Sequence, residues 1–234
     1  IQMVGQTWDD HDRSGRYVCR DFGRNYLMTL QDKGNPIIFT NGDNDTFPLW
    51  YNMDTEGVRT DARVCNLSYL QTDWYIDQMK RPAYTSPSLP INWKRIEYVS
   101  GTNEYIPIEP EYMKQINALY DEKKKSNNPE DLKEVQQLLG DNPYELKNII
   151  KYWMHNPKEQ LRVIPTDSIV FKVDKDAVRR SGMYVPGDSI PDYMHISLKG
   201  KRVLYKSEIM MLELLANTNW TRPLYLAITV GPEN

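Results

Sequence analysis

Two short polar runs carry the side chains best suited to hold a metal ion or a polar ligand. The first is Asp43-Asn44-Asp45, which follows an apolar stretch at 36–40 and the turn-forming pair Asn41-Gly42. Two carboxylates separated by one residue can share a divalent cation with a phosphate, because hard oxygen ligands suit Mg²⁺, Mn²⁺ or Ca²⁺. The same run can instead stabilise the turn and cap the next helix through Asp45 or Thr46. Direct contact with a polar ligand is a third interpretation, and all three stay open.

The second run lies near the start of the chain and mixes acids, a histidine and arginines. Its candidate ligand-binding residues are Asp10, His11, Asp12, Arg13 and Arg16. A histidine between carboxylates can ligate a metal or relay a proton. Adjacent residues of one loop make poor tetrahedral ligands, however, and no further His or Cys pair has zinc-like spacing. A capping and salt-bridge segment is therefore the alternative.

Aromatic residues accompany both runs. Trp8 begins the second run, Trp50 follows the first, and Trp74 lies next to Asp73. Aromatic rings beside carboxylates can form a carbohydrate platform, since the apolar faces of sugars stack on rings while their hydroxyls bond to acids. The alternative is that these rings belong to the core. We take Trp50, Asp73 and Trp74 as candidate ligand-binding residues.

Several signatures of catalysis are absent from the sequence. It has no glycine-rich dinucleotide or nucleotide loop, no serine elbow and no zinc-protease motif. Three His and two Cys are scattered along the chain, so no nucleophilic triad can be assembled. We therefore assign no catalytic residue. No cofactor is required, and a divalent cation at Asp43 and Asp45 is the one cofactor that the sequence suggests.

Charge and hydropathy exclude two further classes. The formal net charge is -3, without the clustered basic surface that nucleic-acid binding requires, so nucleic acid is not an expected partner. No apolar run approaches the roughly 18 to 20 residues that cross a bilayer, and no signal-peptide pattern is present. Because the chain opens on Ile1, we expect a piece of a longer protein.

The elements that must position these residues alternate between strand and helix. Apolar runs at 36–40, 62–67 and 223–230 predict buried strands, and helical periodicity at 14–30, 46–53 and 73–79 predicts helices. This alternation indicates the α/β class, with a mainly parallel sheet flanked by helices. Ligands of such sheets bind at the carboxyl ends of the strands, so residues 43–45 should lie near Asp73 or Trp74.

The rest of the chain predicts additions to one domain that spans 1–234. A helical insertion at 109–160 should place Leu119, Leu132, Val135 and Leu138 inward. A β-hairpin is expected from 95–99 and 104–108 around Gly101. Later elements are expected at 168–173, 195–198, 202–205 and, as a helix capped by Ser207, at 207–215. Cys19 and Cys65 are expected to be buried thiols rather than a disulfide.

Ordered motifs connect the sequence to a known family. They are Trp-Asp-Asp-His-Asp-Arg-Ser-Gly-Arg-Tyr at 8–17, Phe-Thr-Asn-Gly-Asp-Asn-Asp-Thr-Phe-Pro-Leu-Trp-Tyr at 39–51, Glu-Gly-Val-Arg-Thr-Asp at 56–61, Thr-Asp-Trp-Tyr at 72–75 and Asn-Trp-Thr-Arg-Pro-Leu-Tyr at 219–225. They resemble a large bacterial membrane-protein family of formerly unknown function, which is similar to the eukaryotic transmembrane protein O-mannosyltransferases.

This resemblance implies an amino-terminal, multi-spanning membrane half with a lipid-sugar glycosyltransferase fold. The present chain would follow it as a soluble domain on the periplasmic, extracytoplasmic face of a bacterial inner membrane. In such enzymes the catalytic acid lies in the membrane half, so no catalytic residue is carried over and the isolated chain is expected to be inactive. Its expected partners are that membrane half, the acceptor protein and the lipid-linked sugar.

The leading hypothesis is therefore an accessory domain of a protein O-mannosyltransferase-like enzyme that assists acceptor or lipid-linked sugar binding. One alternative is a self-contained metal-dependent enzyme that uses Asp43 and Asp45 on sugar or phosphate substrates. Another is a protein-interaction module that docks through the helical insertion.

Overall fold

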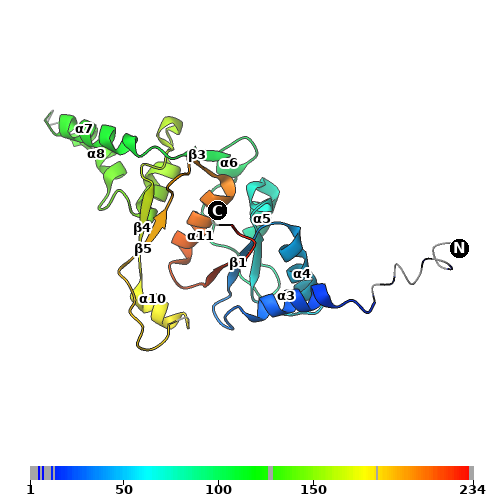
Figure 1. The fold of residues 1–234 in the computed structure, drawn as a ribbon. Helices are drawn as coiled ribbons and strands as arrows, with labels where there is room; N and C mark the ends of the chain where they lie inside the picture. Colours follow the sequence, from blue (N-terminus) through cyan, green and yellow to red (C-terminus); the bar gives the residue numbers. More distant parts are fainter. Residues whose placement is uncertain are drawn as a thin grey trace.

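A small parallel sheet forms the centre of the molecule. The computed structural model describes residues 5, 7, 12, 14–125, 129–182 and 184–231. Strands β1 (Ile37–Thr40), β2 (Arg63–Asn66) and β7 (Leu224–Leu226) pair in the order β2-β1-β7 (Figure 1). Both pairings are parallel, and Ile37 is opposite both Arg63 and Leu224. The predicted neighbourhood of these three runs is confirmed, and so is the α/β class.

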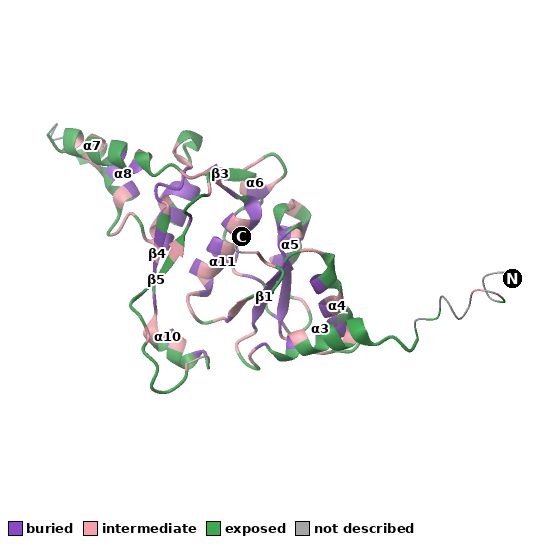
Figure 2. Cartoon of the chain, viewed as in Figure 1, coloured by how far each residue is buried: buried purple, intermediate pink, exposed green. Residues whose placement is uncertain are grey.

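Each face of the sheet is covered by its own set of side chains. Because successive residues of a strand point to opposite faces, Ile38 of β1 joins one core cluster while Ile37 and Phe39 join another. Helices α3 (Val18–Met28) and α4 (Asp43–Asp54) supply Leu27 and Leu49 to the first cluster. The second, larger cluster includes residues of α5 (Asp73–Met79) and α11 (Lys206–Thr218). Strands β1 and β2 are buried along their whole length, as Figure 2 shows for β1, whereas β7 is partly exposed.

Helices α3 and α4 approach each other closely at a glycine. A Cβ atom added to Gly23 would lie 2.3 Å from the carbonyl oxygen of Pro48, so this position requires glycine. The side chain of Asn52 strengthens the contact by donating to the carbonyl oxygens of Arg20 and Pro48, each at 2.8 Å. Cys19 lies in the first turn of α3, before this contact, and is exposed, whereas Cys65 is buried in β2. The expectation of a buried thiol is thus wrong for Cys19 and right for Cys65.

The expected hairpin at 95–99 and 104–108 is wrong. Residues Arg95–Tyr98 form a short helix, α6, because the carboxylate of Glu97 accepts a hydrogen bond from the backbone N–H of Lys94 at 2.7 Å. Strand β3 (Tyr105–Pro107) pairs instead with β6 (Val203–Tyr205), in antiparallel register. A local capping hydrogen bond therefore makes residues 95–98 helical. Residues 105–107 form a strand because they pair with β6, about a hundred residues further along the chain.

The helical segment between β3 and the later strands consists of an arm and a buried base. The arm contains α7 (Glu111–Lys125) and α8 (Pro129–Leu139), which extend from one corner of the molecule in Figure 1. Val135 and Leu138 are buried, whereas Leu119 is partly buried. The base contains α9 (Leu146–Asn148) and a π-helical stretch, Ile149–Met154, whose Trp153 is fully buried in the larger cluster.

The remaining elements are a 3₁₀ turn at Tyr69–Gln71 between β2 and α5, another at Glu159–Leu161, the strands β4 (Ser168–Lys172) and β5 (Tyr193–Ser197), and α10 (Lys175–Arg180). Strands β4 and β5 pair antiparallel. The last helix begins at Lys206, with Tyr205 as its N-cap residue, so Ser207 lies in its first turn rather than at the cap. Within the described ranges, none of the helices combines the length and apolarity needed to cross a bilayer.

Candidate functional site

The first acidic run forms the turn from β1 into α4. Gly42, with a φ of 100°, is the N-cap residue, so the helix begins at Asp43 and the expectation that Asp45 or Thr46 caps it is wrong. Asp43 and Asn44 are exposed. Asp45 is only 1% exposed, and its carboxylate accepts hydrogen bonds from the N–H of Asn41, at 3.3 Å, and from the hydroxyl of Thr229. Asp45 therefore joins this turn to the segment that follows β7.

A buried polar cluster lies directly beneath this turn. The hydroxyls of Thr40 and Thr46 are 2.7 Å apart, and Thr46 also donates to the carbonyl oxygen of Gly42 at 2.5 Å. The amide of Asn66 donates to Thr46 at 2.9 Å and to Gly42 at 3.2 Å. Thr40, Thr46 and Asn66 are fully buried. The carboxyl edge of the sheet is thus closed by hydrogen bonds within the protein.

The proposed cation ligands Asp43 and Asp45 differ sharply in exposure. Asp43 faces solvent, whereas Asp45 lies inside, with its Oδ1 atom buried and lacking a hydrogen-bond partner. Among the residues that the structure describes, no group of three or more His, Cys, Asp and Glu side chains is arranged to hold a metal ion. A divalent cation at this pair stays a prediction.

The second polar run is only partly described. Asp10, His11 and Arg13 lie outside the described residues. Asp12 and Arg16 are exposed, and the carboxylate of Asp12 accepts a hydrogen bond from the N–H of Ser14 at 2.8 Å. The side chain of Ser14 and, to a smaller extent, this N–H bond lower the pKa of Asp12. A role of these residues in ligand binding stays a prediction.

Trp50 and Trp74 come together at a different place, a cleft along the outer edge of β2. The cleft holds about 660 Å³ and is lined by α4, β2, α5 and the loop after α5. Tyr69 lies between the two tryptophans, with ring centroids 6.2 Å from Trp50 and 5.9 Å from Trp74. The run 43–45 does not line this cleft, and Asp73 lies 3.6 Å from Arg95.

Tyr75 closes the strand edge at the base of the cleft. Its hydroxyl accepts a hydrogen bond from the N–H of Asn66 at 3.0 Å and donates to the carbonyl oxygen of Val64 at 3.4 Å. These are backbone groups that an additional strand would otherwise satisfy. Burial raises the pKa of Tyr75, so the hydroxyl stays protonated. The base of the cleft is therefore a fixed, neutral surface.

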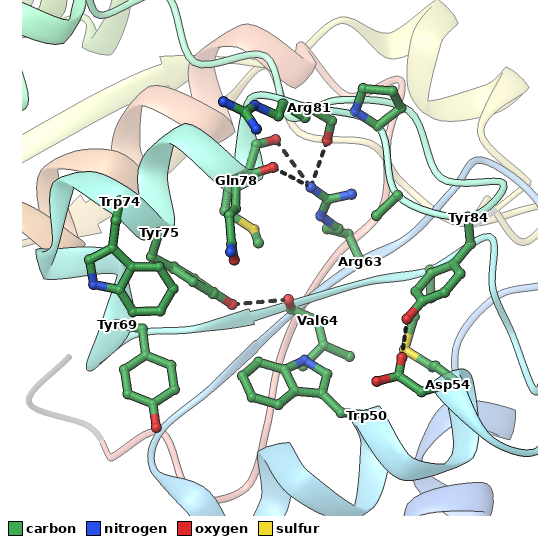
Figure 3. Close-up of a pocket in the computed structure, with 15 residues that line it drawn as sticks. Trp50, Asp54, Arg63, Val64, Tyr69, Trp74, Tyr75, Gln78, Arg81 and Tyr84 are labelled. Carbon is green, nitrogen blue, oxygen red and sulfur yellow. Dashed lines mark hydrogen bonds between the residues drawn. The ribbon is translucent and has the colours of Figure 1, made fainter.

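Arg63 supplies a cation to the wall of the cleft. Its Nη2 atom donates to the carbonyl oxygens of Gln78, at 2.9 Å, and Arg81, at 2.7 Å, which lie at and just beyond the end of α5 (Figure 3). Its Nε and Nη1 atoms are buried without a hydrogen-bond partner. Burial lowers the pKa of Arg63, although the guanidinium remains charged at neutral pH.

A polar pair lines the other end of the cleft. The hydroxyl of Tyr84 donates to the carboxylate of Asp54, and this hydrogen bond raises the pKa of Tyr84. Figure 3 shows this pair on the side away from the rings of Tyr69 and Trp74. The cleft thus offers ring faces at one end and hydrogen-bonding groups at the other. Such an arrangement suits a ligand with both apolar faces and hydroxyl groups.

Sequence reasoning identified two of the cleft residues and missed others. Trp50 and Trp74 were candidates, but Arg63, Tyr69 and Tyr84 were not. Arg63 is part of a short run that predicts a buried strand, and a strand arginine gives no sign of its partners. Tyr69 lies in the connection between β2 and α5. Its place after the carboxyl end of a predicted strand could have identified it, because ligands of such sheets bind there.

The fold and the cleft define an α/β domain with a cleft lined by aromatic residues along one edge of its sheet. The chain belongs to the family named TMEM260-associated domain 2, whose family model matches residues 19–234. Neither the curated proteins nor the solved structures include a significant match.

Proposed function

We propose that this chain is a sugar-binding accessory domain of a membrane-embedded enzyme that resembles the protein O-mannosyltransferases. Membership of the TMEM260-associated family supports the association with such a membrane protein. The motifs at 39–51 and 72–75, which carry the resemblance, also contain Trp50 and Trp74 of the cleft. Trp50 and Trp74 therefore belong both to the family motifs and to the surface that would contact the sugar.

A continuous row of four aromatic rings carries the proposal. Ring centroids are 5.7 Å apart between Phe47 and Trp50, 6.2 Å between Trp50 and Tyr69, and 5.9 Å between Tyr69 and Trp74. The two end members are open to solvent, with Phe47 46% exposed and Trp74 49% exposed. The two rings between them, Trp50 and Tyr69, are partly exposed, so the row forms a continuous aromatic surface of the kind that marks binding grooves. The apolar face of a hexose can stack on such a row.

The cleft beside the row has the size and polarity for a sugar. Its volume of about 660 Å³ falls within the range of small-molecule sites, roughly 300–1,000 Å³. The carboxylate of Asp54 and the hydroxyl of Tyr84 can exchange hydrogen bonds with sugar hydroxyls. The rings would supply contact area, and the polar pair would supply orientation.

In the full-length protein, we place this domain on the extracytoplasmic face of the membrane, next to an amino-terminal multi-spanning half of the same polypeptide. That half would hold the lipid-linked sugar and the catalytic acid. The present domain would bind the sugar of the donor or of a glycosylated acceptor. This chain alone is expected not to transfer sugar.

Removing one end of the ring row tests sugar binding. Titration of the chain with methyl mannoside should change its tryptophan fluorescence, and Trp74→Ala should weaken binding by about tenfold, equivalent to roughly 1.4 kcal/mol. Tyr105→Ala is the matched control, because Tyr105 is 59% exposed on β3 and does not line the cleft. Unchanged affinity of Trp74→Ala, or the absence of binding by any hexose, would contradict the proposal.

A further inference from the structure

The guanidinium of Arg63 lies within the wall of the cleft without a compensating carboxylate. Arg63 is 4% exposed, and within the described chain its hydrogen bonds all run from Nη2 to backbone carbonyl oxygens. Among the described side chains, no carboxylate forms an ion pair with it. Its Nε and Nη1 atoms are also buried without an acceptor. A buried cation with two free donors is rare, because the hydrogen bonds that it made to water are not replaced.

The hydrogen bonds that tie Arg63 to the end of α5 use only one of the three nitrogen atoms of its guanidinium. The acceptors of Nη2 belong to Gln78, Met79 and Arg81, at the carboxyl end of α5, where a cation is favoured by the helix dipole. A lysine could provide the same charge at that end. The planar fork of an arginine adds donors that can bind an oxyanion in a bidentate manner.

A second guanidinium increases the positive potential at this place. Arg222 donates from Nη2 to the hydroxyl of Ser86 at 2.9 Å, and from Nε to the carbonyl oxygen of Asn35. Burial, followed by repulsion from Arg63, lowers the pKa of Arg222 to about 10. Within the described chain Arg222 has no carboxylate partner either, although it lines a different cavity and does not contact the cleft directly.

The balance of charge along the cleft favours a negative ligand. Arg81 lines the cleft and is exposed, which adds a third arginine at its mouth. Among the described lining residues the single carboxylate is that of Asp54, which already accepts the hydroxyl proton of Tyr84. Figure 3 shows Arg63 and Arg81 on the opposite side of the cleft from the rings of Tyr69 and Trp74.

We propose that the ligand of this cleft is a sugar that carries an anionic group, with its ring on Trp50, Tyr69 and Trp74 and its oxyanion at Arg63. This inference rests on the proposed function and names the substrate class of the same site. Arg81 attracts and contacts the anion at the mouth. The oxyanion is a phosphate ester or a carboxylate, because a guanidinium binds both through paired hydrogen bonds.

Calorimetric titration of the chain with four probes tests the inference. The probes are methyl mannoside, mannose 6-phosphate, methyl glucuronide and inorganic phosphate. At least one charged sugar should bind ten times more tightly than methyl mannoside at low salt, and this advantage should shrink as ionic strength rises. Tighter binding of mannose 6-phosphate assigns a phosphorylated sugar, whereas tighter binding of the glucuronide assigns a uronic acid; either result supports the inference.

Variants locate the anion. Arg63→Met should abolish the preference for the charged sugar, so that charged and neutral sugars bind this variant with the same affinity. Because Arg63 also holds the end of α5, Arg81→Ala provides a second test that does not disturb a buried residue, and it should reduce the preference severalfold. Arg180→Ala, an exposed arginine on α10 away from the cleft, should change nothing.

The results that overturn the inference differ from those that overturn the proposed function. Equal affinity for methyl mannoside and both charged sugars would refute the anionic ligand and leave sugar binding in place. Inorganic phosphate binding as tightly as mannose 6-phosphate would also refute it, since the site would then select an anion without a sugar. Failure of all three sugars to bind would refute the proposed function itself, and the inference with it.

Discussion

The carboxyl edge of the sheet and the cleft beside β2 both contain polar side chains, but the two regions use them differently. At the carboxyl edge, Asp45, Thr46 and Asn66 are buried. Thr46 and Asn66 donate to the carbonyl oxygen of Gly42, and Asp45 accepts from the hydroxyl of Thr229. In the cleft, Trp74 is 49% exposed and Arg63 keeps two donors without partners. The first region uses most of its polar groups to hold the fold, although the Oδ1 atom of Asp45 has no partner. The second region keeps an exposed ring and an arginine with two unpartnered nitrogen atoms. Exposed rings, rather than polar residue types, therefore distinguish the cleft from the edge.

The largest effect on stability should come from Asn66, which links the two turns. Its amide donates to Thr46 and Gly42, and its Oδ1 accepts from the N–H of Tyr69 at 3.0 Å. Asn66→Ala should lower the free energy of unfolding by about 3 kcal/mol, because several buried hydrogen bonds are lost together. Urea unfolding measures this value. Asn44→Ala, exposed on the same turn, should stay within about 0.5 kcal/mol and serves as its control.

Asp45 should affect stability but not ligand binding. Asp45→Ala leaves the N–H of Asn41 and the hydroxyl of Thr229 without their carboxylate, so the free energy of unfolding should fall by about 2 kcal/mol. Thermal unfolding of the chain, paired with glycosylation of an acceptor in cells that carry the full-length variant, separates the two roles. A normal melting temperature combined with lost glycosylation would make Asp45 a ligand-binding residue and contradict this comparison.

The fold could be predicted from the sequence where the signal is local. Apolar runs ending at turn residues located β1, β2 and β7, and their alternation with helices gave the parallel order. The short helix α6 was missed because Glu97 is held both by Lys94 and by His155, which lies 58 positions away. The pairing of β3 with β6 joins segments that are still further apart, because Tyr105 is opposite Tyr205. Such long-range contacts leave no periodic pattern in the chain.

The candidate site could be predicted only in part, for a related reason. Aromatic residues next to acidic residues in the sequence pointed to Trp50 and Trp74, and both line the cleft. The acidic run at 43–45 looked equally suited to a ligand, yet hydrogen bonds to Asn41 and Thr229 turn Asp45 inward. Whether a carboxylate has a partner within the protein depends on the tertiary fold. The same holds for Arg63, whose lack of a carboxylate partner is not visible in the sequence.

His155 provides a pH-dependent test that should leave both regions unaffected. Burial opposes its charged form, but the nearby Glu213, whose Oε2 lies 3.7 Å from Nε2, and the hydrogen bond with Glu97 at 2.8 Å raise the pKa of His155 overall. A raised pKa in the folded state stabilises the protein fully below the unfolded pKa, about 6.5, and this stabilisation is lost as pH rises through the folded value.

The stability difference between the wild type and His155→Gln should therefore be larger at pH 6 than at pH 8.5. Urea unfolding at the two pH values measures it. Sugar affinity should not differ between the two proteins at either pH, since His155 does not line the cleft. A stability difference that grows with pH would show that the sign of this pKa shift is wrong.

The smallest effect on stability should come from the cleft itself. Trp74→Ala removes a ring that is half exposed, so the free energy of unfolding should change by no more than about 1 kcal/mol while sugar binding weakens about tenfold. If the two regions have separate roles, Trp74→Ala loses sugar binding and keeps its stability, whereas Asn66→Ala loses stability and keeps sugar binding. Parallel losses of stability and binding in both variants would show that the regions are not separate.

The most direct test of the central claim is to observe which residues respond when a sugar binds. Addition of methyl mannoside to the isotopically labelled chain should shift the indole N–H signals of Trp50 and Trp74, assigned with Trp50→Phe and Trp74→Phe, in a magnetic resonance titration. The backbone amide signals of 41–46 should stay in place, because hydrogen bonds within the protein close that turn. Shifts confined to the amides of 41–46, with both indole signals unchanged, would contradict the account and return the site to the carboxyl edge of the sheet.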